Sequence, residues 1–148
     1  MKEQEYKHIR NLAWDLLINA KITKLPVDIF AIATVYDFQS EIDPKKSRYE
    51  NMLNISQHVL DLFGYNSNVD NAKYLTIRIL APIIVFKALN ISSANDICKY
   101  TDLPYHLSVQ RFDRYQKLLQ RNMFCTSNLE TKVLKQFQPW IKSMNSQI

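Results

Sequence analysis

Zinc-dependent hydrolysis is the first chemistry to test for in the sequence, because two histidines four residues apart on one helix can share a metal ion. The sequence has three histidines, His8, His58 and His106, and no two of them have this spacing. From His58 the chain reads His-Val-Leu-Asp-Leu, which contains neither a glutamate base nor a second histidine. The residues therefore predict no catalytic residue, no metal ligand set and no cofactor.

Basic side chains form the second pattern that could support a function. They recur every three or four positions along residues 104–121, so they lie on one face of a predicted helix. An aromatic residue and a histidine stand near the N-terminus of the same helix. The candidate partner-binding residues are Tyr105, His106, Arg111, Arg114, Lys117 and Arg121.

Two interpretations of this basic face stay open. Residues 94–120 have the layout of a helix-turn-helix, with a short helix, a turn at 101–103 and a longer second helix, which would place the arginines on DNA phosphates. A basic stripe opposite an apolar face formed by Val109, Phe112 and Leu119 is also typical of any surface helix. We expect a protein partner, and duplex DNA is the alternative partner.

The composition limits the fold class. The chain has 148 residues, enough for one domain with a single core, and only one glycine. Tight hairpins and phosphate-cradling loops depend on glycine, so the sequence predicts one all-α domain over residues 1–148, with about six to seven helices. The formal net charge is +5, and residues 94–148 carry most of the excess. This charge permits an acidic partner.

No membrane span and no secretory signal are expected, because no apolar run is long enough and the first residues are charged. We therefore expect a cytoplasmic protein in which Cys98 and Cys125 are reduced thiols. No residue pattern specifies an oligomeric state.

Helical periodicity and capping residues predict the elements in the first half of the chain. An amphipathic stripe predicts a helix over residues 6–20, and Pro26 suits the first turn of a second helix that buries Phe30. The polar residues 37–46 have room for one strand at most. A third helix is predicted over residues 47–63, with Phe63 facing inward and Gly64 as its left-handed cap.

The second half begins with a helix that is apolar on nearly every side. We expect Asp70 to cap it and Pro82 to kink or split it. Ser93 is the predicted cap of the short helix from residue 94, and Ser127 opens the last helix. We expect Pro139 to disturb the end of that helix and residues 143–148 to fray.

This order of elements resembles a known family. The apolar helix closes on an Ile-Leu-Ala-Pro sequence at residues 79–82 and is followed by the short and the long basic helix, and a Leu-Pro-Val-Asp sequence opens the second helix at residues 25–28. Over residues 6–36 and 70–141 the chain is similar to ImmA/IrrE-type metallopeptidases.

The resemblance implies that His58 matches the first zinc ligand of the family, while Val59 replaces the glutamate base and Leu62 the second histidine. Asn71 falls on the position of the third ligand, a glutamate. The chain then resembles a truncated, degenerate relative that lacks the HExxH motif.

The same resemblance implies a function. The family works beside a DNA-binding repressor, and a relative without the metal site would keep partner recognition while losing cleavage. We expect a non-catalytic, protein-binding regulator or inhibitor, encoded by a phage or other mobile element, that acts on a host, repressor or defence protein as an anti-CRISPR-like inhibitor would. A helix-turn-helix transcriptional regulator and a residual zinc metallopeptidase are the alternatives.

Overall fold

Helices account for all the regular structure that the computed structural model places in residues 3–122 and 127–146, which are the residues it describes. No strand occurs among them, so the predicted all-α fold is confirmed, and the possible strand at residues 37–46 is absent. The elements, including two short 3-10 helices labelled η, are α1 (Glu3–Asn19), α2 (Ile29–Thr34), η1 (Gln39–Glu41), α3 (Arg48–Leu62), α4 (Val69–Leu80), η2 (Ile83–Val85), α5 (Ala94–Thr101), α6 (Tyr105–Arg121) and α7 (Asn128–Asn145).

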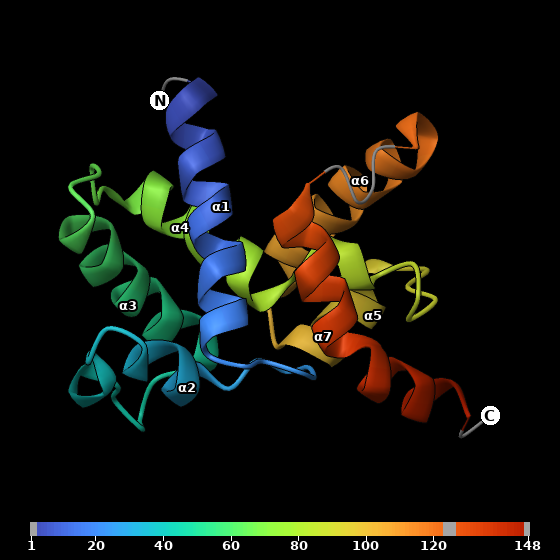
Figure 1. Cartoon of the computed structure of the whole chain (residues 1–148), viewed down its shortest axis with the longest axis horizontal. Helices are drawn as coiled ribbons and strands as arrows, with labels where there is room; N and C mark the ends of the chain where they lie inside the picture. The colour runs from blue at the N-terminus through green and yellow to red at the C-terminus, as the bar shows by residue number, and fades with distance from the viewer. Residues whose placement is uncertain (1–2, 123–126, 147–148) are drawn as a thin grey trace.

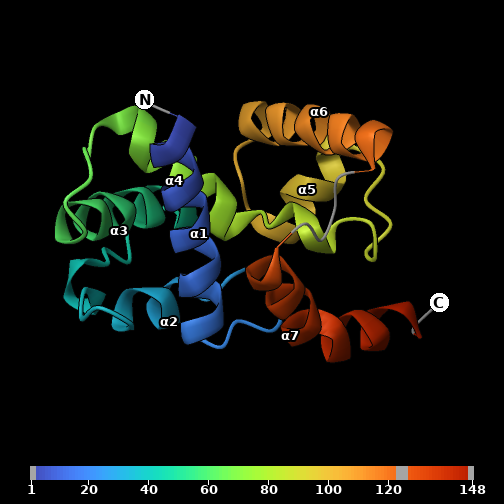
Figure 2. The same ribbon diagram turned by 45° about the horizontal axis from the view of Figure 1, so that its top comes forward.

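The helices form two groups on either side of one core. Helix α4 packs against both α1 and α3, and α2 packs against α3, while α5 packs against α6 in the other group (Figure 1). Helix α7 contacts α1 and η2 and so joins the groups, which lie to the left and right in Figure 2. The buried apolar side chains form one cluster that includes Leu16, Met52, Leu75, Phe86 and Phe137.

The predicted break at Pro82 is confirmed and lies between the two groups. Helix α4 ends at Leu80, and the chain resumes at Ile83 as the 3-10 helix η2. Proline lacks an N–H and its ring clashes with the preceding turn, so the helix cannot continue through it. As a result, the carbonyl of Ala81 points out of the helix and is available to a side chain from elsewhere in the fold.

The second helix differs from its prediction. It begins at Ile29, because the Asp28 carboxylate accepts a hydrogen bond from the Ala31 N–H at 3.2 Å and acts as the N-cap. Pro26 therefore lies before the helix and not in its first turn. Ile32 and Ala33 are the buried residues of this helix, whereas Phe30 is 58% exposed, so the prediction for Phe30 is wrong.

The left-handed residue predicted after α3 is confirmed, and the N-cap predicted for α4 is wrong. Ser47 and Glu50 form a capping box at the start of α3, and Gly64 has the predicted left-handed conformation, with φ of +76°. Phe63 was predicted to face inward and is 45% exposed. Asn68, not Asp70, caps α4, because its side chain accepts the Asn71 N–H at 2.8 Å.

Helix α7 continues through Pro139 to Asn145. The predicted disturbance at Pro139 and the predicted fraying of residues 143–145 are therefore wrong, and residues 147–148 lie outside the described part of the chain. Val133, Phe137 and Ile141 recur every four residues and are buried, so tertiary packing holds the helix on both sides of the proline.

The predicted pair of helices in the last third is present. Ser93 caps α5, and Asp102 takes the left-handed position between α5 and α6, with φ of +58°. The free thiol of Cys98 lies 3.2 Å from the Ser108 hydroxyl oxygen, which ties the two helices together. The predicted state of Cys125 falls outside the described residues.

Candidate functional site: an arginine pocket

The structure leaves most of the predicted basic face of α6 exposed and buries one of its residues. Tyr105, His106, Arg114, Lys117 and Arg121 are exposed, as a partner-binding face requires. Lys117 is engaged on that face in an ion pair with Asp113, at 3.0 Å.

Arg111 was predicted to share this exposed face, and that prediction is wrong. It is only 8% exposed, because it belongs to a buried stripe at i, i+4 spacing that also includes Leu107 and Tyr115. The predicted apolar face also differs, since Val109 is 44% and Leu119 41% exposed.

Arg111 is held by the break in α4. Its Nε–H donates a hydrogen bond to the Ala81 carbonyl at 2.9 Å, which satisfies the backbone oxygen that the proline leaves outside the helix. Burial lowers the pKa of Arg111 well below its usual value, and repulsion from the nearby Arg78 lowers it further. The guanidinium group is therefore a cation in an unfavourable environment.

Arg78 reaches the same region from α4. Its guanidinium carbon lies 3.4 Å from the centre of the Tyr74 ring, and one Nη donates to the Tyr74 carbonyl at 3.3 Å. Burial lowers the pKa of Arg78 to about 10, and repulsion from Arg114 and Arg10 adds to the shift, although Tyr74 opposes it. A cation–π contact thus fixes the position of this arginine.

Arg10 and Trp14 complete the site from α1. They are four residues apart, so they lie on one side of the helix, and the guanidinium carbon of Arg10 is 5.2 Å from the centre of the Trp14 ring. The Nε–H of Arg10 is buried and has no hydrogen-bond partner. A buried donor without a partner is costly, which is typical of groups that await a ligand.

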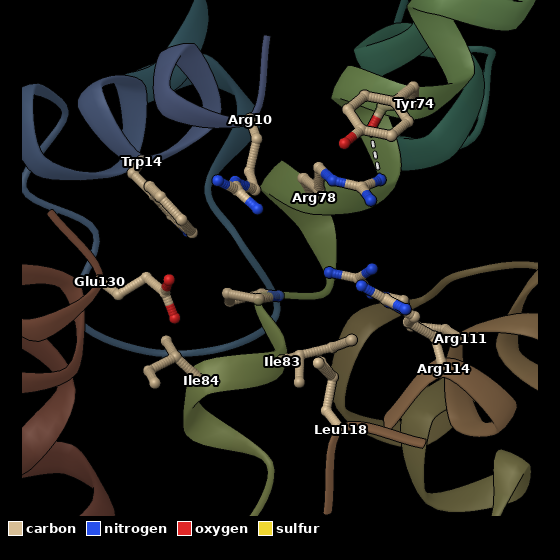
Figure 3. Close-up of a pocket in the computed structure, with 11 residues that line it drawn as sticks. Arg10, Trp14, Tyr74, Arg78, Ile83, Ile84, Arg111, Arg114, Leu118 and Glu130 are labelled. Atoms are coloured by element: carbon tan, nitrogen blue, oxygen red, sulfur yellow. Dashed lines mark hydrogen bonds between the residues drawn. The ribbon is translucent and has the colours of Figure 1, made fainter. Parts of the chain in front are cut away.

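These side chains surround one hollow of about 150 Å³ between the two groups of helices. Figure 3 shows the four guanidinium groups around this space, with that of Arg10 beside Trp14 and that of Arg78 beside Tyr74, and Glu130 of α7 on the opposite side. We call this site the arginine pocket. Its lining residues are Arg10, Trp14, Tyr74, Arg78, Pro82, Ile83, Ile84, Arg111, Arg114, Leu118 and Glu130.

The arginine pocket has a strong excess of positive charge. Within residues 3–122 and 127–146, none of its four arginines forms an ion pair with a carboxylate. Arginine presents five N–H donors in a planar fork that matches carboxylate and phosphate oxygens. The arrangement can therefore bind an anion and hold it in a fixed orientation.

The residues implicated by the zinc interpretation lie elsewhere and do not assemble a ligand set. The Nε2 of His58 is 3.5 Å from a Glu41 carboxylate oxygen, and its ring stacks on Phe38. Asn71 donates its side-chain amide to the Asn66 carbonyl at 2.8 Å. In the described part of the chain, no three His, Cys, Asp or Glu side chains come close enough to hold a metal ion.

A scan of protein-family models and searches of curated proteins and of solved structures found no match to this chain. The similarity to ImmA/IrrE-type proteins therefore stays a prediction from the sequence. Among the described residues, none of the helices has the length and apolar character needed to span a bilayer.

Proposed function

We propose that this chain is a non-catalytic, cytoplasmic binding protein that recognises an acidic group on a partner protein, with the arginine pocket as its anchoring site. The observation that carries the proposal is the meeting of four guanidinium groups from three helices in one hollow, without a carboxylate ion pair to any of them in the described residues. Among these residues, Arg111 is buried without a carboxylate partner, which is unfavourable in the unbound protein and favours the binding of an anion.

The sequence suggests a biological setting for this proposal. A degenerate relative of the ImmA/IrrE family, encoded by a phage or other mobile element, would bind a repressor or a host defence protein and inhibit or sequester it. The exposed residues Tyr105, His106, Lys117 and Arg121 lie on the same helix as two of the pocket arginines. They would extend the contact with the partner beyond the pocket.

Anion-dependent stabilisation tests this function without knowledge of the partner. Thermal unfolding is measured in benzoate, glutarate, sulfate and phosphate against chloride at equal ionic strength. At least one oxyanion, at about ten times its Kd, should raise the Tm by about 3–5 °C, because a ligand that binds only the folded state stabilises it. The rise should persist in Arg121→Gln, a charge-removal control on the exposed part of α6.

The same rise should be absent in Arg111→Met, which removes the buried charge and keeps an unbranched side chain of similar length. Equal Tm shifts in the wild type and in Arg111→Met would show that the anions act elsewhere and would contradict the proposal. A panel with no shift above that of chloride would contradict it as well.

DNA binding is the second candidate, and the exposure of Tyr105 and His106 at the N-terminus of α6 favours it. We expect duplex DNA to bind weakly at physiological salt, because Lys117 is paired with Asp113 and Arg111 is buried. A fluorescence titration over a series of salt concentrations measures this. Tight, sequence-selective binding that is lost in Arg121→Gln and retained in Arg111→Met would favour the DNA-binding function instead.

A further inference from the structure

We propose that the ligand group of the arginine pocket is a phosphate monoester in its dianionic form. This inference rests on the proposed function and narrows its ligand from any acidic group to one chemical class. Three features of the pocket carry it: the balance of charge, the number and direction of the donors, and the size and lining of the hollow.

The charge balance favours a ligand with two negative charges. Four guanidinium groups face the hollow, and the only carboxylate among its described lining residues is Glu130. Arg78 and Arg111 are close enough for repulsion between them to lower the pKa of Arg111. A carboxylate ligand has one negative charge and would leave most of the excess positive charge uncompensated. A phosphate monoester contributes up to two negative charges near neutral pH.

The donors point to a ligand with several acceptor oxygens. Among the described residues, two of the four guanidinium groups donate a hydrogen bond. Arg111 donates to the Ala81 carbonyl, and Arg78 donates to the Tyr74 carbonyl. Most of their N–H groups are therefore available, including the buried Nε–H of Arg10. They approach from α1, α4 and α6, which are different directions in space (Figure 3).

A carboxylate offers two oxygens in one plane, and a phosphate monoester offers three terminal oxygens in a pyramid. N–H donors that approach from three helices match the three oxygens of the phosphate better than the two oxygens of the carboxylate. Paired arginine–phosphate contacts are also among the strongest hydrogen bonds in proteins, because donor and acceptor are both charged.

The size and lining of the hollow fit one phosphate and the start of its ester chain. Its volume of about 150 Å³ is well above the space that a single water molecule needs. Ile83, Ile84 and Leu118 line the side away from Arg78 and give the ester carbons an apolar contact. The phosphate could belong to a phosphorylated side chain of the partner protein or to a small phosphorylated molecule.

Isothermal titration calorimetry with phenyl phosphate and benzoate tests the inference, because the two probes share a ring and differ in the anion. At pH 7.5 phenyl phosphate should bind at least about tenfold more tightly than benzoate. At pH 5 its affinity should fall about tenfold, since a phosphate monoester loses one negative charge below a pKa of about 6. Both Arg78→Met and Arg111→Met should abolish its binding, and Lys99→Gln, at an exposed residue of α5 outside the pocket, should retain it.

Benzoate at both pH values is the control for titration of the protein itself. Tyr74 and Glu130 are the titratable groups besides the arginines among the described residues that line the pocket, and Glu3, Tyr6 and Lys7 lie near Arg10 on its other side, so an effect of pH on the protein would alter the binding of both probes. Equal affinities for the two probes, without the loss at pH 5, would overturn the phosphate inference and leave the proposed function intact. Failure of both probes to bind would overturn both.

Two further titrations distinguish the sources of the phosphate. A peptide with a central phosphoserine is compared with free phosphoserine at pH 7.5. Tighter binding of the peptide, by about tenfold, supports a phosphorylated partner protein, because flanking residues then contribute contacts. Equal affinity supports a small phosphorylated molecule. Binding of the unphosphorylated peptide as tightly as its phosphorylated form would contradict the inference.

Discussion

Replacing Arg78 with methionine is expected to raise the free energy of unfolding of the unbound protein by about 1–2 kcal/mol. The lowering of the Arg78 pKa to about 10 means that its charged form costs on the order of 3 kcal/mol in the folded state. Methionine removes this cost and adapts its shape to the space. The lost contacts with Tyr74 offset part of the gain. Urea unfolding of both proteins at pH 7.5 measures the difference.

The gain from Arg78→Met should depend on pH in a defined direction. The folded-state pKa is below the unfolded-state value, so the wild type carries the full cost at any pH below about 10. The cost decreases as the pH rises above about 10, because the folded protein then loses the proton that the unfolded chain retains. The stability difference should therefore be constant from pH 6 to 9 and smaller at pH 11.

Lys117→Met is the matched control, because Lys117 is an exposed cation of α6 in an ion pair with Asp113. Its effect should stay within about 0.5 kcal/mol of zero. A destabilisation above about 1 kcal/mol in Arg78→Met would show that the arginine serves the fold, and would contradict its assignment to ligand binding. A protein that gains stability and loses anion binding has the trade-off expected of a functional site.

Replacing Phe86 with alanine is expected to lower the free energy of unfolding by about 3–5 kcal/mol. Phe86 is completely buried, and its ring meets Tyr115 edge to face with centroids 5.4 Å apart. It follows directly after η2, whose residues form one wall of the arginine pocket. Its removal leaves a large cavity where Phe86 packs against Tyr115 of α6. Urea or thermal unfolding measures the loss.

Phe30→Ala is the control for this substitution. It removes the same atoms at a position that is 58% exposed, so its cost should stay below about 1 kcal/mol. Similar losses of unfolding free energy in the two variants would contradict the packing described for Phe86. In Phe86→Ala, the Tm rise caused by oxyanions should also be smaller, because the wall beside Ile83 is no longer supported.

Local chemistry explains which parts of the fold could be predicted from the sequence. Ser47, Ser93 and Ser127 cap their helices, Gly64 is left-handed and Pro82 ends α4, and each of these depends on the residue and its nearest neighbours. The errors at Asp70 and Pro26 are shifts of a few residues. In both cases another polar side chain, Asn68 or Asp28, made the better cap.

The arginine pocket could not be predicted because packing between distant segments decides which arginine is buried. Arg111 and Arg114 have the spacing of one basic stripe, yet only Arg111 continues the buried stripe of Leu107 and Tyr115. Arg78 did carry a signal, as a cation between Ile77 and Ile79 in the apolar second half of its helix. Arg10 carried none, because it is an ordinary charged residue of an amphipathic helix until α4 and α6 approach it.

A crystal structure of the full chain grown with phenyl phosphate is the most direct test of the arginine pocket as a ligand site. We expect electron density for the phosphate in the hollow, with its oxygens within hydrogen-bond distance of at least two of the four guanidinium groups, and the ring towards Ile83 and Leu118. A pocket that holds only water, while the protein binds phenyl phosphate in solution or elsewhere in the crystal, would contradict it.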